Sequence, residues 1–246
     1  MKIVAVIPAR YESSRFQGKP LADIKGKPMI WWTYQQAKKV KEISDVYVAT
    51  DDKRIFDCCE EYGINVVMTS NEHLTGTDRV AEVARKVQAD IYINIQGDEP
   101  LIEPDTIRSV LPPIMNDNNI KIVNLMSKIK NPVDVVNTTI PKVITNNNNK
   151  ALFLTRAATP YPKGAIDFDY YKQVCVYAFT RETLEFYSEY GKKYGKSKNE
   201  RIEDIEILRF LDNGFEVQFV EVETRSVAVD TKKDLERVCN ILECKE

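Results

Sequence analysis

The sequence predicts an α/β fold with a mostly parallel central sheet flanked by helices. Short apolar runs of strand length alternate with segments of helical character through the first part of the chain. Strands separated by helices of this length form right-handed βαβ units, whose strands pair in parallel. The chain has 246 residues, of which 43% are hydrophobic, and this size and balance suit a globular domain. We therefore expect residues 1–246 to form a single domain.

The first half of the chain carries the regular part of this pattern. Continuous apolar runs such as IVAVIP are typical of strands that are buried on both faces of a sheet. Pro28 suits the first turn of a helix, and Gly63 suits the position after a helix end. The expected strands are residues 3–8, 46–50, 64–69 and 91–95, and the expected helices are residues 28–41, 52–62 and 77–87.

The second half is less regular but still contains recognisable elements. The asparagine run near residue 147 is typical of a surface turn between two strands. An amphipathic pattern over residues 201–211, with Gly214 beyond it, predicts a helix. The other expected elements are strands within residues 142–152, at 173–180 and at 215–222, and a final helix at 231–243.

Composition excludes several classes of function. The net charge of −2 argues against a nucleic-acid partner, because such proteins rely on a broad basic field. The five cysteines form no CxxC pair and His73 is the single histidine, which excludes a zinc site and a Ser–His triad. We expect free thiols, and we expect His73 to be a loop residue rather than a base.

The sequence shows no pattern for export or for membrane insertion. The apolar run at the N-terminus is too short for a signal peptide, and no apolar run approaches the length of a membrane span. We therefore expect a soluble, cytoplasmic protein without a membrane partner.

Polar residues follow each early strand at the point where the strand ends. Ligands of open α/β sheets bind beyond the carboxyl ends of the strands, so these residues are expected to gather at one edge. Together they supply the cations, hydroxyls and carboxylates that hold a polyphosphate and its metal ion. They are Arg10, Arg15 and Lys19, then Asp51 and Asp52, then Thr69 and Ser70, and finally Gln96, Gly97 and Asp98.

The loop after the first strand is neither a Walker A motif nor a GxGxxG motif. Its physical logic is nevertheless that of a phosphate site, because it combines backbone N–H groups with cations at a strand end. Arginine binds phosphate in two places and lysine adds a point charge. The alternative is that Arg10, Arg15 and Lys19 are solvated surface cations.

The stretch IPARYESSRFQGKPL, residues 7–21, resembles the start of the 3-deoxy-manno-octulosonate (Kdo) cytidylyltransferases. The resemblance continues in order over nearly the whole chain. It runs through VATDD (48–52), MTS (68–70), TGTDR (75–79), INIQGDEPLI (93–102), LFLTRAATPYP (152–162), YKQVCVYAFTR (171–181) and VDTKKDLERV (229–238).

This resemblance implies a Rossmann-like nucleotidyltransferase fold with a small mixed lobe for sugar binding and dimerisation. The implied reaction transfers CMP from CTP to the anomeric hydroxyl of Kdo and releases pyrophosphate, and a homodimer is expected. The implied cofactor is Mg²⁺, with Asp98 and Asp230 as metal ligands. The implied catalytic residues are Arg10, Arg15, Lys19 and Asp98. Asp230 also fits an ordinary helix N-cap.

The resemblance also implies two sets of binding residues. The nucleotide-binding set is Pro8, Ala9, Arg10, Lys19, Thr69, Ser70, Thr75, Gly76, Thr77, Arg79 and Gln96. The sugar-acid set is Arg156, Gln173, Tyr177 and Glu206. Other roles are open for some of them. Thr75 and Thr77 could cap a helix, Tyr177 could belong to the core, and Glu206 could lie on an exposed helix face.

Two positions depart from the family pattern on the sugar side. Gln173 stands where the family has His, and Ile207 stands where it has Gln. A site that loses a hydrogen-bond partner can discriminate strongly between ligands. The alternatives are therefore a cytidylyltransferase for another acid, such as amino-Kdo or a nonulosonic acid, and a non-catalytic nucleotide sensor. A sensor would not need both Asp98 and Asp230.

Overall fold

The structure is a computed structural model that describes residues 1–12, 16–164, 167–224 and 226–243. The chain divides into two units, each with its own internal packing. The first comprises Met1–Arg108 and Thr224–Glu246, and the second comprises Ser109–Glu223. The expectation of one domain stays a prediction.

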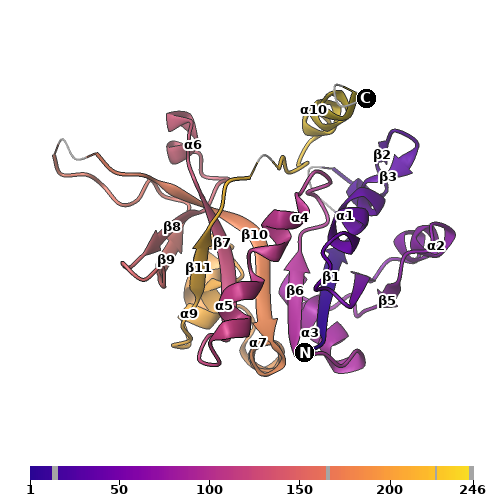
Figure 1. The fold of residues 1–246 in the computed structure, drawn as a ribbon, viewed down its shortest axis with the longest axis horizontal. Helices are drawn as coiled ribbons and strands as arrows, with labels where there is room; N and C mark the ends of the chain where they lie inside the picture. Colours follow the sequence, from indigo (N-terminus) through magenta and orange to yellow (C-terminus); the bar gives the residue numbers. More distant parts are fainter. Residues whose placement is uncertain (13–15, 165–166, 225, 244–246) are drawn as a thin grey trace. The chain divides into compact units, whose positions relative to one another are not determined.

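A parallel sheet forms the centre of the first unit. Strand β1 (Ile3–Ala9) pairs in parallel with β4 (Asp45–Thr50) on one side and with β6 (Ile91–Ile95) on the other. β4 pairs in turn with β5 (Val66–Met68), and Figure 1 shows β1 and β6 side by side. The side chains from Val4 to Ile7 are fully buried, as expected of a strand covered on both faces.

Helices follow the strands of this unit in the predicted alternation. Local signals explain where two of them begin. The Asp52 carboxylate accepts the N–H of Arg54 at the start of α2, and Thr75 forms a capping box with Asp78 at the start of α3. The unit contains η1 (Lys19–Leu21), β2 (Asp23–Ile24), β3 (Lys27–Pro28), α1 (Met29–Lys38), α2 (Lys53–Glu61), α3 (Gly76–Lys86), α4 (Pro104–Arg108) and α10 (Lys232–Glu243).

The C-terminal segment packs against the N-terminal part of the first unit. Val229 and Val238 are fully buried in one apolar cluster with Ile24 and Met29. Each such side chain contributes about 1.5–3 kcal/mol when it leaves water. This packing places Asp230, which follows Val229 directly, in the same unit as the early strands.

The second unit contains a mixed sheet. Strand β7 (Ile122–Lys128) pairs antiparallel with β10 (Tyr171–Thr180) and parallel with β11 (Gln218–Glu221). β10 also pairs with β8 (Lys142–Thr145), which pairs with β9 (Ala151–Thr155) around the predicted asparagine turn. A parallel sheet with flanking helices and a mixed sheet confirm the predicted fold class.

The helices of the second unit differ from the prediction. Strand β7 and helix α7 (Arg181–Tyr194) were not predicted from periodicity. Helices α5 (Leu111–Asn116) and α6 (Pro132–Val136) are short. The single helix predicted over 201–211 is wrong. Instead, α8 (Lys198–Glu203) and α9 (Leu208–Leu211) are separate helices.

The break between α8 and α9 lies at Asp204. Its backbone takes a left-handed conformation with φ of 51°, and its N–H closes α8 on the carbonyl of Glu200 at 2.8 Å. The carbonyls of Glu203 and Asp204, at the end of α8, accept from the guanidinium of Arg156. A side chain distant in sequence thus takes the acceptors that a continuing helix would use.

Two expectations from composition can also be compared with the structure. Cys58, Cys59, Cys175 and Cys239 form no disulfide bond, which confirms the expectation of thiols for the part of the chain that is described; Cys244 lies outside it. Burial raises the pKa of the Cys59 thiol to about 12. Among the described residues, no helix combines the length and the apolar character needed to cross a bilayer.

Candidate active site

Two acidic residues far apart in the sequence converge on one lysine in the first unit. Lys19 Nζ lies 2.7 Å from Asp98 Oδ2 and 3.5 Å from Asp230 Oδ1. Asp98 follows β6, and its carbonyl accepts the N–H of Val229 at 2.9 Å, which ties the two segments together. The structure therefore brings the predicted metal ligands to one place, beside a predicted phosphate-binding cation.

This arrangement suits a divalent cation that also binds phosphate. Within the described ranges, no group of three or more His, Cys, Asp or Glu side chains could hold a metal by itself. Mg²⁺ is typically held by one or two carboxylates together with substrate phosphates and waters. Asp98 and Asp230 already share one positive charge, that of Lys19, so their oxygens are aimed at a single cation. Enzymes that transfer phosphoryl-type groups generally use a divalent metal to neutralise the phosphate charge.

Gly97, in the turn after β6, packs tightly against its neighbours. A Cβ on Gly97 would lie 3.2 Å from the carbonyl oxygen of Pro8 and 3.2 Å from Cδ1 of Ile30. The Gly97 carbonyl also accepts from Thr33 Oγ1 at 3.3 Å. This close packing holds the Gln96–Asp98 turn against the end of β1, where the predicted nucleotide residues Pro8 and Ala9 lie.

The opening loop is closed by backbone and aromatic contacts. The Gly18 N–H donates to the Tyr11 carbonyl at 2.8 Å, with a φ of 70° at Gly18 that favours glycine. The guanidinium of Arg54 lies 3.2 Å from the centre of the Tyr11 ring, and Asp52 holds that guanidinium through two hydrogen bonds of 2.9 and 2.6 Å. The second strand end thus supports the loop that follows the first.

The predicted cations of this loop have protein partners. Arg10 Nη2 donates to the carbonyl of His73 at 2.9 Å, and Lys19 binds the two aspartates. The reading as solvated surface cations is therefore wrong for these two. The predicted catalytic residue Arg15 lies outside the described residues.

Arg79 supports the predicted nucleotide-binding residues Thr69 and Ser70 from inside the protein. Its Nη1 donates to Thr69 Oγ1 at 2.7 Å and to the Ser70 carbonyl at 3.0 Å, while Nη2 lies 2.5 Å from Asp51 Oδ2. The side chain has no exposed surface, and burial lowers the pKa of Arg79, partly opposed by Asp51. Arg79 orders Thr69 and Ser70, and direct contact with a nucleotide stays a prediction.

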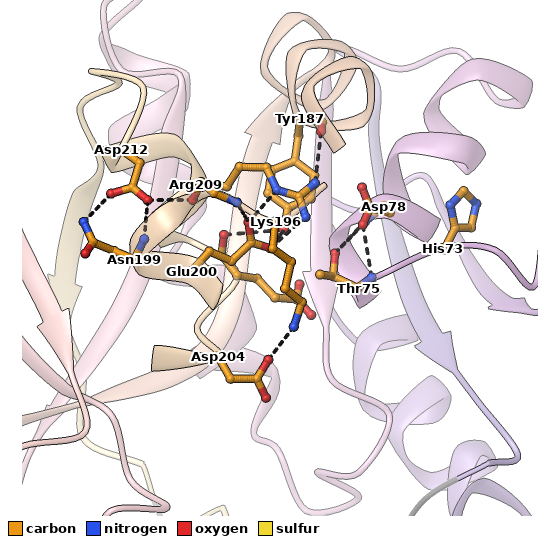
Figure 2. A network of polar contacts seen from close by, with 12 residues as sticks. His73, Thr75, Asp78, Tyr187, Lys196, Asn199, Glu200, Asp204, Arg209 and Asp212 are labelled. Atoms are coloured by element: carbon orange, nitrogen blue, oxygen red, sulfur yellow. Dashed lines mark hydrogen bonds and ion pairs between the residues drawn. The ribbon is translucent and has the colours of Figure 1, made fainter. Parts of the chain in front are cut away.

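The TGTDR segment begins α3 as an N-cap. Asp78 Oδ2 accepts from the N–H of Thr75 at 3.0 Å and from its hydroxyl at 2.8 Å (Figure 2). Thr77 is buried and its hydroxyl accepts from Asn94 at 3.3 Å. The capping role expected as an alternative is confirmed for Thr75. Gly76 is the first residue of the helix, and the nucleotide contacts of all three stay predictions.

Arg156, in the second unit, is engaged by backbone carbonyls. Its Nε donates to Glu203 O at 2.6 Å and its Nη2 to Asp204 O at 3.1 Å. Its Nη1 donates to the carbonyls of Thr138 and Thr139, both at 3.1 Å. Four of the five N–H donors of the guanidinium are thereby used to join two loops. Its predicted role toward an acidic sugar is a second task that stays untested.

The first departure from the family pattern is part of a buried amide network. Gln173 Nε2 donates to Asn124 Oδ1 at 2.8 Å, and Asn124 Nδ2 donates to the carbonyls of Val174 and Val176, both at 2.9 Å. The register of β10 against β7 shifts between Val174 and Tyr177, and Asn124 takes up the carbonyls at this irregularity. Gln173 is thus held by the fold as well as predicted to face the sugar.

The remaining predicted sugar residues have mixed surroundings. Tyr177 is buried beside Phe179, as its core reading expected, and burial raises the pKa of the Tyr177 hydroxyl. Ile207 is 1% exposed, so an apolar side chain suits this position. Glu206 is half-buried in the turn before α9, so its reading as part of an exposed helix face is wrong.

Sequence reasoning missed one residue that contacts the predicted nucleotide-binding segment. Glu82, on α3, accepts hydrogen bonds from the predicted nucleotide residue Ser70 and from His73. The only signal was its spacing. Glu82 follows Asp78 by four residues and therefore shares a helix face with the residue that caps the loop.

Several known proteins are similar to this chain over most of its length. The family model described as Cytidylyltransferase matches residues 4–242. The 3-deoxy-manno-octulosonate cytidylyltransferase of Escherichia coli is 40% identical over 237 residues, covering 96% of this chain and 94% of the relative. The enzyme of the same name from Geobacter metallireducens is 40% identical over 251 residues, covering 97% and 96%.

A solved structure is also similar along the full chain. It is CMP:2-keto-3-deoxy-manno-octonic acid synthetase complexed with CTP, with a TM-score of 0.93 at 39% identity and 100% coverage of both chains. The similarity thus extends over the motif residues of the first unit and over the mixed sheet of the second. On this evidence the chain belongs to the cytidylyltransferase family, among the 3-deoxy-manno-octulosonate cytidylyltransferases.

Proposed function

We propose that this protein transfers CMP from CTP to the anomeric hydroxyl of 3-deoxy-D-manno-octulosonate and releases pyrophosphate. The observation that carries the proposal is the convergence of Asp98 and Asp230 on Lys19 in the first unit. A non-catalytic sensor would not need this pair of carboxylates. The names of the relatives do not favour another acidic acceptor, although Gln173 and Ile207 depart from the family pattern.

In the proposed reaction the sugar hydroxyl oxygen attacks the α-phosphorus of CTP, and the bond from that phosphorus to the bridging oxygen breaks in line. The hydroxyl proton passes to solvent. Arg10, Arg15 and Lys19 hold the triphosphate and stabilise the negative charge of the departing pyrophosphate. Asp98 and Asp230 would hold Mg²⁺, which when bound neutralises phosphate oxygens. Arg156, Gln173, Tyr177 and Glu206 are the proposed residues for the sugar acid.

Other properties follow from the family resemblance alone. The homodimeric state and the cytoplasmic location are proposals, as is the choice of Mg²⁺ among divalent cations. The direct nucleotide contacts of Pro8, Ala9, Thr69, Ser70 and Gln96 are proposals of the same standing.

Pyrophosphate release from CTP, Mg²⁺ and Kdo tests the proposal directly. Release should require both CTP and Kdo, and replacing CTP with UTP or GTP should remove most of it. A matched reaction with a nonulosonic acid in place of Kdo controls for acceptor choice. Turnover with that acid and none with Kdo would reject the proposed acceptor. Silence with every acid in a protein that binds CTP would reject catalysis.

A further inference from the structure

One carboxylate outside the predicted site holds the segment that precedes α3. We call residues 69–74 the nucleotide loop, since Thr69 and Ser70 are its predicted nucleotide contacts. Glu82 Oε2 accepts the N–H of Ser70 at 2.9 Å and lies 2.5 Å from His73 Nε2. An ionised carboxylate only accepts hydrogen bonds, so the hydrogen lies on His73 Nε2. Glu82 therefore grips the loop at two points.

The Glu82 carboxylate is well satisfied and charged. Its Oε1 accepts from Lys86 Nζ at 2.6 Å, and its side chain is 15% exposed. Burial opposes ionisation, but hydrogen bonds from Lys86, Ser70 and His73 outweigh it and lower the pKa of Glu82 to about 2. Lys86 itself also donates to the carbonyl of Met68 at 2.8 Å. The same cluster thus holds the residue just before the loop.

His73 connects Glu82 to Arg10, one of the predicted triphosphate ligands. The carbonyl of His73 accepts from Arg10 Nη2 at 2.9 Å. Arg10 follows β1 and is a predicted triphosphate ligand. The chain of contacts runs from Glu82 to His73 and from the His73 backbone to Arg10, so a shift of His73 moves the acceptor that orients this cation.

We infer that Glu82 is a positioning residue of the nucleotide site, which sets the nucleotide loop and, through His73, Arg10 in the arrangement that binds CTP. The inference rests on the proposed function, since it assigns Glu82 to the donor half of that reaction. A purely structural role differs in its consequences. A helix pair such as Glu82–Lys86 contributes little to stability. If Glu82 were only structural, its loss would affect the binding of CTP and of Kdo alike.

The test measures the KM for CTP and the KM for Kdo separately, together with the Kd for CTP, in Glu82→Ala and Glu82→Gln. For Glu82→Ala we expect the KM and the calorimetric Kd for CTP to rise about tenfold, with the KM for Kdo within about twofold of wild type. In Glu82→Gln the KM and Kd for CTP should rise less, because the amide oxygen of the glutamine can still accept one N–H. His73→Ala should weaken CTP binding too. The double variant Glu82→Ala/His73→Ala should bind CTP about as weakly as Glu82→Ala alone, because both substitutions remove the same contact.

Asp57→Ala is the matched control. Asp57 forms the corresponding i,i+4 pair with Lys53 at 2.7 Å on α2, outside the nucleotide loop, so the CTP affinity of Asp57→Ala should stay at the wild-type value. A folded Glu82→Ala with CTP Kd within twofold of wild type would overturn the inference, as would equal rises in both KM values. If Glu82→Ala does not fold, the same criteria apply to Glu82→Gln and His73→Ala. If the wild type binds CTP but releases no pyrophosphate, the proposed function fails while the CTP affinities still decide the role of Glu82.

Discussion

Asp98→Asn should lower the turnover of CTP and Kdo by about 100- to 1,000-fold while the protein stays folded. The substitution keeps the shape of the side chain and leaves the backbone bond from Val229 N–H to the Asp98 carbonyl in place. It removes one of the two negative charges that converge at Lys19. A divalent cation would lose an anionic ligand, and the phosphates would lose the charge compensation that this cation supplies.

The measurement is kcat from pyrophosphate release over a series of Mg²⁺ concentrations, with EDTA as the metal-free control. We expect the Mg²⁺ concentration for half-maximal activity to rise in Asp98→Asn. Asp105→Asn is the comparison variant, because Asp105 belongs to the same unit, is 90% exposed and pairs with Arg108. It should retain wild-type turnover. Near-normal turnover of a folded Asp98→Asn would reject Asp98 as a metal ligand.

Arg209→Met should lower the free energy of unfolding by about 3–5 kcal/mol, because it leaves the Glu200 carboxylate buried without its counter-charge. Arg209 Nε and Nη2 donate to the two oxygens of Glu200 at 2.8 and 2.7 Å, and the two side chains are 0% and 1% exposed. The guanidinium also lies 3.7 Å from the centre of the Tyr187 ring (Figure 2). The pair joins α8 and α9 across the turn that carries Glu206.

Urea denaturation measures this loss, with circular dichroism as the signal. Adding Glu200→Leu to Arg209→Met should restore part of the stability, since the isolated charge is then gone. Arg181→Met is a control of the same chemistry, because Arg181 forms an exposed pair with Glu185 on α7, and such pairs contribute about 0–1 kcal/mol. A loss in Arg209→Met no larger than that of the control would mean that water reaches Glu200 and solvates its charge.

The expected loss of stability and the expected loss of turnover have different origins. Asp98→Asn leaves Lys19 with its second partner Asp230 and with partial access to water, whereas Arg209→Met leaves the Glu200 charge without access to water. Asp98→Asn should therefore change kcat with little change in unfolding. Arg209→Met should change unfolding first, and activity only through the loss of folded protein.

Local patterns in the sequence determined the first unit well. Continuous apolar runs predict buried strands, and the first polar residue after each run predicts where the strand ends. Lys19 and Asp98 could be assigned to one edge because the carboxyl ends of parallel strands share that edge. The capping role of Thr75 could also be predicted from the sequence, because capping depends on neighbours three residues apart, here Thr75 and Asp78.

The tertiary structure decided the features that depend on contacts between distant segments. Asp230 joins Asp98 because α10 packs on Ile24 and Met29, and Arg156 ends a helix that its own periodicity would continue. Glu82 contacts Ser70 and His73 only because the loop before α3 folds back onto that helix. Periodicity and capping report on neighbours along the chain, whereas these contacts depend on which carbonyls, charges and apolar faces remain available once the elements have packed.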